Sequence, residues 1–146
     1  MSDPKELKRI DGLFNLASAR SRPFLDQCSE TKYLAVRDYK RATDETLKLA
    51  NQTLKFADAK YPTLTSDLSE IKSAVKAGQL DASFIDALSN LRTKYIEQVL
   101  RPAVRTYLKN EELKTSDLDS YYESALRING LLEVVKFLKR IRPHLF

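Results

Sequence analysis

The stretch FIDALSNLRTKYIEQVLRPAVRTY, residues 84–107, has the clearest structural pattern in this chain. Its apolar side chains recur every three or four residues, the spacing at which residues share one face of an α-helix. Asp81 precedes it and can cap the helix by accepting a hydrogen bond from a first-turn amide. The phase survives across Pro102, so a kink within one helix is expected. The predicted buried face consists of Phe84, Leu88, Leu91, Tyr95, Val99, Ala103 and Tyr107, widened by Ile85 and Ile96.

A similar helix is predicted to begin at Thr115 or Ser116 and to end at Arg142. Gly130 lies inside it, where glycine either weakens the helix or lets another backbone approach closely. The connection over residues 109–116 is short and polar, which favours antiparallel packing of the two helices. The buried face predicted for this helix consists of Leu118, Tyr121, Ala125, Ile128, Leu132, Val135 and Leu138.

The first half of the chain predicts three more helices. Asp3 and Pro4 are typical of a helix start, and Pro23 predicts a break or kink over residues 18–23. A long second helix is then predicted to end before Pro62, and Gly78 predicts the end of a short third helix. The inner faces predicted for these helices are Leu7, Ile10, Phe14 and Ala17; then Val36, Thr43, Leu47, Ala50, Leu54, Ala57 and Tyr61; then Leu68, Ile71, Ala74 and Val75.

These patterns predict one all-α domain over residues 1–146. The 146 residues are 42% hydrophobic, which is enough for one core without staples, and only 3 are glycine and 5 proline. Leu, Ala, Lys, Arg and Glu dominate, and these residues favour helix. We therefore expect a five-helix bundle with two or three long helices, mostly antiparallel.

Catalytic and cofactor motifs are missing from the sequence. It contains no Gly-rich phosphate loop, no nucleophile elbow and no zinc-protease motif, and its only histidine is His144, near the end. The single cysteine, Cys28, excludes an internal disulfide and is expected to be a small buried hydrophobe. We predict a protein that is not an enzyme and has no cofactor or metal. Its carboxylates at Glu111, Glu112, Asp117, Asp119 and Glu123 are expected to be solvated.

No apolar run is long enough for a membrane span, and the charged amino terminus is unlike a secretory signal. A cytoplasmic location without membrane contact is therefore expected.

Positive charge is concentrated in two segments of the carboxyl-terminal half. The chain has a net charge of +5. Residues 92–109 contain five basic residues and one acidic residue, and residues 134–146 contain four basic residues and none that is acidic. The segment between them, 110–133, is acidic, with six carboxylates against two basic residues. Such banding favours a polar docking surface over an evenly solvated one.

The basic residues of these two segments form a candidate nucleic-acid site. Arg101, Arg105 and Lys109 are four residues apart and share one helix face. If the two helices pack antiparallel, the basic end of the last helix approaches Arg92 and Lys94, giving one positive strip. Guanidinium and ammonium groups bind phosphates without sequence preference. The alternative is an ordinary solvated face. The candidate site comprises Arg92, Lys94, Arg101, Arg105, Lys109, Lys136, Lys139, Arg140 and Arg142.

Residues 63–142 resemble the small helical subunits of CRISPR effector complexes, especially those of type III systems. The resemblance rests on Leu64-Thr65-Ser66 at a helix start, on residues 84–91, on Tyr95 and Arg101, and on the amphipathic last helix. It implies a structural subunit without catalytic activity, stacked in several copies with other subunits. It also implies that the basic residues hold the backbone of the guide–target duplex or of the displaced strand. Whether the nucleic acid is DNA or RNA stays open.

A protein–protein adaptor is the rival interpretation. In that case the helix predicted over residues 30–61 presents its threonine, alanine and leucine seam to a partner helix, and the basic strip meets an acidic protein. Tyr121 and Tyr122 are candidates for base stacking, although Tyr121 also fits the predicted core face.

Overall fold

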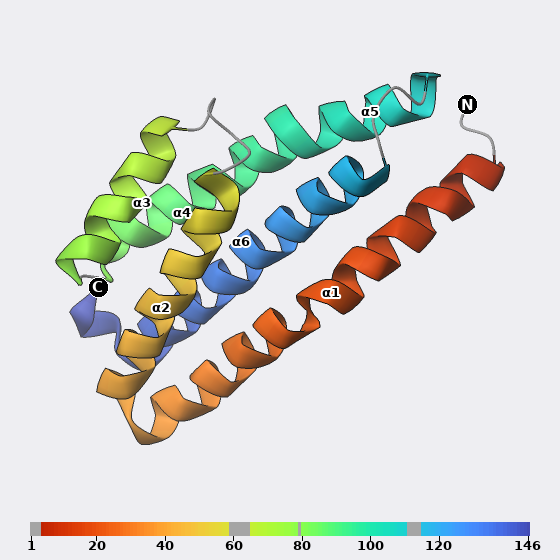
Figure 1. Ribbon diagram of the computed structural model, residues 1–146. Coiled ribbons are helices and arrows are strands. Elements are labelled where there is room, and N and C mark those ends of the chain that lie inside the picture. Colours follow the sequence, from red (N-terminus) through yellow and green to blue (C-terminus); the bar gives the residue numbers. More distant parts are fainter. Residues whose placement is uncertain (1–3, 59–64, 79, 111–114) are drawn as a thin grey trace.

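A computed structural model describes residues 4–58, 65–78, 80–110 and 115–146, and within these ranges every regular element is helical. The predicted all-α fold is confirmed. The elements are α1 (Pro4–Arg37), α2 (Tyr39–Asp58), α3 (Thr65–Ala77), α4 (Ala82–Tyr95), the π-helix η2 (Ile96–Leu100), α5 (Arg101–Asn110), α6 (Thr115–Ile141) and the 3₁₀-helix η3 (Pro143–Leu145) (Figure 1).

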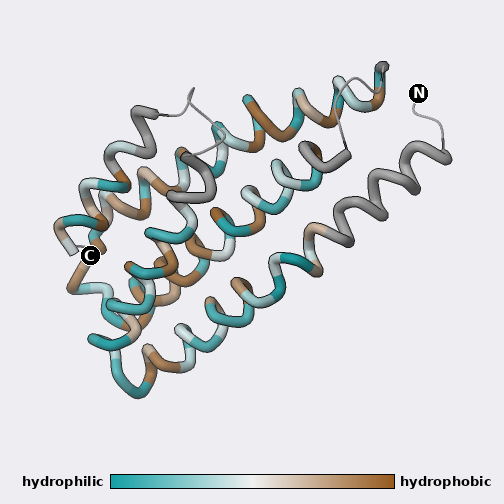
Figure 2. The backbone as a smooth tube through the Cα atoms, viewed as in Figure 1, coloured by the Kyte–Doolittle hydropathy of each residue, from teal (hydrophilic) through white to brown (hydrophobic). Residues whose placement is uncertain are grey.

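Helix α6 is the central element of the bundle and packs against α1, α2, α4 and α5. Its predicted buried face is confirmed, with Leu118, Ile128 and Leu132 fully buried and Tyr121 half-buried. Leu131 and Val134 are also fully buried, so α6 is covered on more than one side. Figure 2 shows hydrophobic residues recurring along α4 and α6, whereas the corner between α1 and α2 is largely hydrophilic.

Helices α4, η2 and α5 follow one another as a single rod, so the predicted continuity across Pro102 is confirmed. Proline has no amide hydrogen, and the preceding turn adopts π geometry, in which the Arg101 amide donates to the Ile96 carbonyl five residues earlier. Asp81 caps the rod by accepting a hydrogen bond from the Phe84 amide at 2.9 Å. The predicted core face is buried along the rod, except that Val99 and Ile96 are half-buried.

Of the break or kink predicted over residues 18–23, the break is wrong, because α1 continues through Pro23 to Arg37. Pro23 has no amide hydrogen, so the carbonyl of Ala19 lacks its helical hydrogen bond. Both residues lie on the exposed side of the helix, where water can bind that carbonyl instead. The buried face of the described part alternates steps of four and three residues: Ala17, Ser21, Phe24, Cys28, Thr31 and Ala35. The predicted face members Leu7, Ile10 and Phe14 lie outside the residues whose side chains are described.

The long helix predicted over residues 30–61 is wrong, because α1 ends at Arg37 and α2 begins at Tyr39. The carboxylate of Asp38 caps α2 by accepting a hydrogen bond from the Arg41 amide at 3.2 Å. Val36, predicted to be in the core seam, is 71% exposed. The Leu54, Ala57 and Tyr61 part of that seam lies outside the described side chains.

The buried face of α2 is rotated away from the predicted one and includes two threonines. It consists of Ala42, Thr46, Leu49, Ala50 and Thr53, whereas Thr43 and Leu47 are only half-buried. The hydroxyls of Thr46 and Thr53 donate to the carbonyls of Ala42 and Leu49 at 2.7 Å and 2.9 Å. These bonds remove most of the cost of burying a hydroxyl.

The third helix ends as predicted at Gly78, which adopts a φ of 71°, and within it Ile71 is fully buried while Ala74 and Val75 are half-buried. The rod runs antiparallel to α6, since Arg92 contacts Asn129 while Tyr95 contacts the earlier Tyr121. Helix α1 instead runs in the same direction as α6 (Figure 1), with Arg20 beside Asp119 and Tyr39 beside Leu138. Among the described helices, none is sufficiently long and apolar to cross a membrane.

Candidate nucleic-acid interface

The outer face of α5 presents three exposed cations, Arg101, Arg105 and Lys109, which we call the α5 basic face. Within the described parts of the chain, none of the three has an acidic partner within ion-pair distance. Their four-residue spacing places like charges next to each other on the helix, and such pairs destabilise a helix by a few tenths of a kcal/mol each. The repulsion between these like charges does not stabilise the fold, whereas Lys109, in the last turn of α5, interacts favourably with the helix dipole.

A shallow groove between the rod and α6 joins Arg92 to this face. Half-buried Arg92 donates through Nη1 to Oδ1 of Asn129 on α6 at 3.0 Å. Arg101 lines the same groove from the other side of the π turn, and so does the carboxylate of Glu97. The groove therefore holds two guanidinium groups, one of them held in position by an amide.

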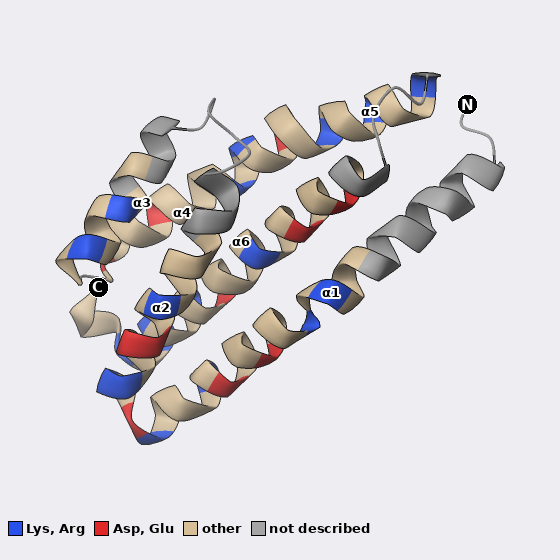
Figure 3. Cartoon of the chain, viewed as in Figure 1, with Lys and Arg blue, Asp and Glu red and all other residues tan. Residues whose placement is uncertain are grey.

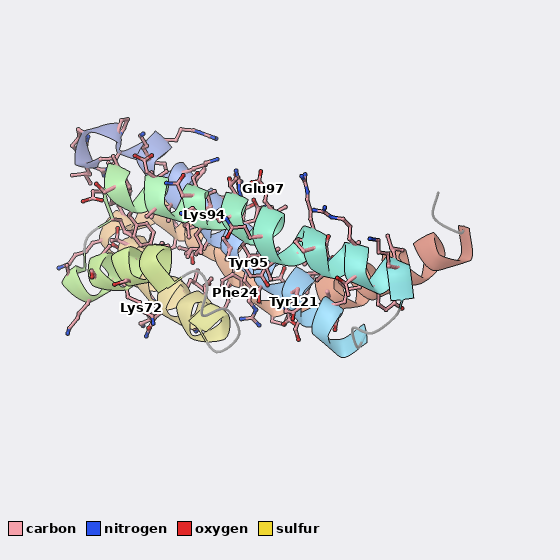
Figure 4. The ribbon with its side chains drawn as sticks, turned by 90° about the horizontal axis from the view of Figure 1, so that it is seen from above. Phe24, Lys72, Lys94, Tyr95, Glu97 and Tyr121 are labelled. Atoms are coloured by element: carbon pink, nitrogen blue, oxygen red, sulfur yellow. The ribbon has the colours of Figure 1, made fainter. Side chains whose placement is uncertain are left out.

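Lys94 does not belong to this groove. It follows Arg92 by two residues and is therefore rotated by about 200° around the helix axis. Figure 4 places Lys94 and Glu97 on the rod, while Phe24, Tyr95 and Tyr121 meet in the middle of the bundle from three different elements. Of the predicted site residues on the rod, Arg92 and Arg101 line the groove, Arg105 and Lys109 continue the α5 basic face, and Lys94 is separate.

The basic residues at the end of α6 form a second cluster, which we call the α6 end cluster: Lys136, half-buried, and the exposed Lys139, Arg140 and Arg142. Within the described chain, the first three make no ion pair. The Arg142 guanidinium lies over the Tyr39 ring at 5.4 Å from its centroid, so this cluster contacts the start of α2. Stacking on the ring leaves the edge of the guanidinium available for hydrogen bonds.

The two clusters lie at opposite ends of the rod and α6, not in one continuous strip. With Arg92 opposite Asn129, antiparallel packing places Lys136 level with residue 85. Arg105 is twenty residues farther along the rod, which corresponds to about 30 Å. Exposed Glu133 lies on α6 between Asn129 and Lys136. As predicted, α6 runs antiparallel to the rod, so its basic end lies toward the start of α4. It passes beyond Arg92 and Lys94, however, because Lys136 lies level with residue 85.

Two of the carboxylates predicted to be solvated are instead paired with arginines, one of them buried and the other half-buried. Asp119 is 2% exposed and is paired with Arg20 of α1. The Glu123 side chain is 13% exposed and is paired with Arg127 at 3.3 Å, while the Arg127 guanidinium lies over the Phe24 ring. Figure 3 shows this acidic first half of α6 beside the basic residues of α1. Glu111, Glu112 and Asp117 lie outside the described side chains.

The aromatic and nucleophilic candidates have mainly structural positions. Half-buried Tyr121 packs into the core, and its carbonyl accepts a hydrogen bond from the Tyr95 hydroxyl at 3.0 Å. Burial raises the pKa of the Cys28 thiol to about 11, against the opposing effect of Lys32, so the thiol is protonated and unreactive at neutral pH. Burial likewise raises the pKa of Tyr39, which the Arg142 charge partly offsets. His144 is exposed. No grouping of possible metal ligands occurs among the described residues.

Sequence reasoning missed a third set of cations, at the corner between α1 and α2. Arg37 ends α1, Arg41 lies in the first turn of α2, and both line a groove with the exposed ring of Tyr33. The predicted continuous helix concealed this corner. The sequence signal for it was Asp38, an N-cap residue followed by a helix.

No protein-family model, curated protein or solved structure matches the chain.

Proposed function

We propose that this protein is a structural subunit without catalytic activity in a ribonucleoprotein effector complex of the CRISPR type. In this proposal it holds the backbone of the guide–target duplex or of the displaced strand, alongside other subunits and further copies of itself. The α5 basic face and the groove around Arg92 provide the principal contact, and the α6 end cluster provides a second contact.

One observation carries this proposal: Arg101, Arg105 and Lys109 lie at four-residue spacing on the α5 basic face and have no acidic partner among the described residues. Two arginines of the α1–α6 interface are neutralised instead, Arg20 by Asp119 and Arg127 by Glu123. Cations that repel one another in the free protein gain their stabilisation when they meet an anionic partner. A nucleic-acid backbone is such a partner, because it presents phosphates at regular intervals and needs no particular base.

The spacing of the two clusters supports a duplex as the ligand. They are about 30 Å apart along the rod, while one turn of duplex DNA spans about 34–36 Å. A protein of this size can therefore touch phosphates roughly one turn apart along one side of a duplex. The carboxylates of Glu97 and Glu133 between the clusters disfavour continuous contact, so we expect two separated footprints.

Charge reversal on the α5 basic face tests the proposal. The variant Arg101→Glu with Arg105→Glu is compared with Lys40→Glu with Lys76→Glu, which changes the net charge equally at exposed sites on α2 and α3. Fluorescence anisotropy with a labelled duplex, over a range of salt concentrations, gives affinity and its salt dependence. The α5 variant is expected to bind at least about tenfold more weakly and to lose about 1 from the log–log salt slope for each residue.

The control variant is expected to keep the slope of the original protein. Equal effects of the two variants would mean that only net charge matters and that this face is not the site. Retention of partners after nuclease treatment of a pull-down would instead favour a protein adaptor. The helix predicted for that adaptor is interrupted at Asp38, so its continuous seam is not formed.

A further inference from the structure

The corner between α1 and α2 exposes an aromatic ring next to unpaired cations. Tyr33 is 74% exposed, the largest value among the exposed large hydrophobic side chains of the described chain, and Val36, one turn on, is 71% exposed. Aromatic rings are normally buried because much of their surface is apolar, so an exposed ring beside a second apolar side chain indicates a contact surface.

A groove surrounds this ring. It is lined by Glu30, Tyr33, Leu34 and Arg37 from α1 and by Arg41 from α2. It therefore has two guanidinium groups and a single carboxylate around one phenol ring. Neither arginine side chain makes an ion pair with any described residue. The nearby Asp38 carboxylate is already engaged as the α2 cap.

We propose that this corner binds unpaired nucleotides, with the Tyr33 ring stacked on a base and Arg37 and Arg41 on the flanking phosphates. The inference rests on the proposed function and deepens it, because it adds a site that selects single strands. Every base has a π-face, so stacking on tyrosine needs no particular sequence, and the two arginines of the same groove can bind the phosphates of the backbone. In a duplex the base faces are covered by their neighbours, so Tyr33 cannot reach them.

The positions of the two sites fit the junction of a duplex and an unpaired strand. The α1–α2 corner lies at one end of the bundle, and α5 lies at the other (Figure 1). On α2, exposed Arg41 points away from the buried face formed by Ala42 and Thr46, while Arg142 of the α6 end cluster lies over the ring of Tyr39 at the start of α2. The α6 end cluster therefore lies next to the corner, so a duplex that runs along the rod from α5 to this cluster can continue into an unpaired segment at the corner.

Tyr33→Ala in the full-length chain tests the stacking, with Tyr33→Phe as the matched control that keeps the ring. Three fluorescein-labelled probes of equal length are used: a 20-nucleotide polyuridine strand, the same backbone with abasic sites, and a duplex. Tyr33→Ala is expected to weaken binding of the intact strand about tenfold, within the range for loss of one stacked base. Binding of the abasic strand and of the duplex is expected to stay unchanged. Tyr33→Phe is expected to retain the affinity of the original protein for all three probes.

The arginines are tested by Arg37→Glu with Arg41→Glu. This variant is expected to weaken binding of the intact and abasic strands alike and to reduce the salt slope, because phosphates are common to both. Equal affinity of the original protein and Tyr33→Ala for the intact strand overturns the inference. So does a loss of self-association or protein capture without change in oligonucleotide binding, which assigns the corner to a protein partner.

The two proposals fail separately. If Arg101→Glu with Arg105→Glu weakens duplex binding while Tyr33→Ala leaves the single strand unaffected, the proposed function stands and the corner site is wrong. If the original protein binds none of the three probes, both are wrong.

Discussion

Arginines serve opposite purposes in the α1–α6 interface and on the α5 basic face. In the interface, Arg20 and Arg127 reach Asp119 and Glu123, whose side chains are 2% and 13% exposed. On α5, Arg101 and Arg105 face solvent beside each other and have no acidic partner in the described chain. The Arg20–Asp119 pair joins α1 to α6. The Arg127–Glu123 pair lies within α6 and places Arg127 over the Phe24 ring of α1, whereas the like charges on α5 slightly oppose folding. A cation that is paired with a buried carboxylate therefore stabilises the fold, whereas an exposed cation without such a partner is available to bind another molecule.

The two regions also differ in how closely the helices approach. Gly130 lies where α6 meets α1, and a Cβ atom at this position would lie 2.8 Å from Cδ2 of Leu25 and 3.5 Å from Sγ of Cys28. Helix α1 therefore contacts the α6 backbone itself. The cations of the α5 basic face are exposed among the described residues, so they can be changed without disturbing packing there.

The largest effect is expected for Gly130→Leu. A leucine has no room between α6 and the Phe24, Leu25 and Cys28 side chains, so we expect a loss of about 3 kcal/mol in the free energy of unfolding. Gly130→Ala is the graded control. Its single methyl group meets the flexible end of Leu25, and alanine favours helix by about 1 kcal/mol, so the two effects nearly cancel. Urea denaturation measures both, and a neutral Gly130→Leu would contradict the close approach.

The next effect concerns the buried thiol of Cys28 in the same interface. Folding raises its pKa from 9.0 to about 11, so the folded chain holds the proton more tightly than the unfolded chain. The resulting stability is complete below pH 9 and is lost as the pH rises to 11, by about 2–3 kcal/mol. Urea denaturation from pH 8 to pH 11 measures this loss of stability. The original protein is expected to lose about 2–3 kcal/mol more than Cys28→Ala over this range, because the variant has no thiol. Parallel curves for the two proteins would contradict burial of the thiol.

A third prediction concerns the ion pair at the edge of the interface. Arg20→Ala leaves the buried Asp119 carboxylate without its partner, and we expect a loss of about 2 kcal/mol, less than for a fully buried pair because Arg20 is half-exposed. Arg22→Ala is the control, since Arg22 and Asp26 are both largely exposed and such pairs contribute little. Equal losses in the two variants would mean that Asp119 is not held by Arg20.

Much of the fold could be predicted from the strongly periodic helices. The apolar faces of the rod and of α6 contain large residues at regular spacing, and they are buried as predicted. Helix α1 was harder, because Ser21 and Thr31 occupy its buried face beside Cys28, whose burial was predicted. A pattern of hydrophobic residues cannot detect a helix face made of small and hydroxyl-bearing residues. Pro23 also predicted a break or kink, but the helix continues because the carbonyl left without a donor is exposed to water.

The candidate site could be predicted only in part, because sequence spacing specifies a helix face but not the neighbours of that face. The four-residue spacing of Arg101, Arg105 and Lys109 was sufficient to place them together on the exposed side. The positions of the α6 end cluster depend on the register between α6 and the rod, which is set by contacts such as Arg92 with Asn129. The corner of Tyr33 and Arg41 depends on the break at Asp38.

The smallest expected change in stability is that of Arg105→Ala, and it distinguishes the α5 basic face from the α1–α6 interface most directly. Arg105→Ala removes a charge that repels both Arg101 and Lys109 at four-residue spacing, and it replaces arginine with a stronger helix former. We therefore expect the free energy of unfolding to increase by a few tenths of a kcal/mol, up to about 0.5. Added salt screens the repulsion, so the gain over the original protein is expected to shrink at high ionic strength. Thermal and urea denaturation at low and high salt measure this. A loss above about 1 kcal/mol would show that Arg105 has a structural role after all, and its charge would then no longer indicate a partner.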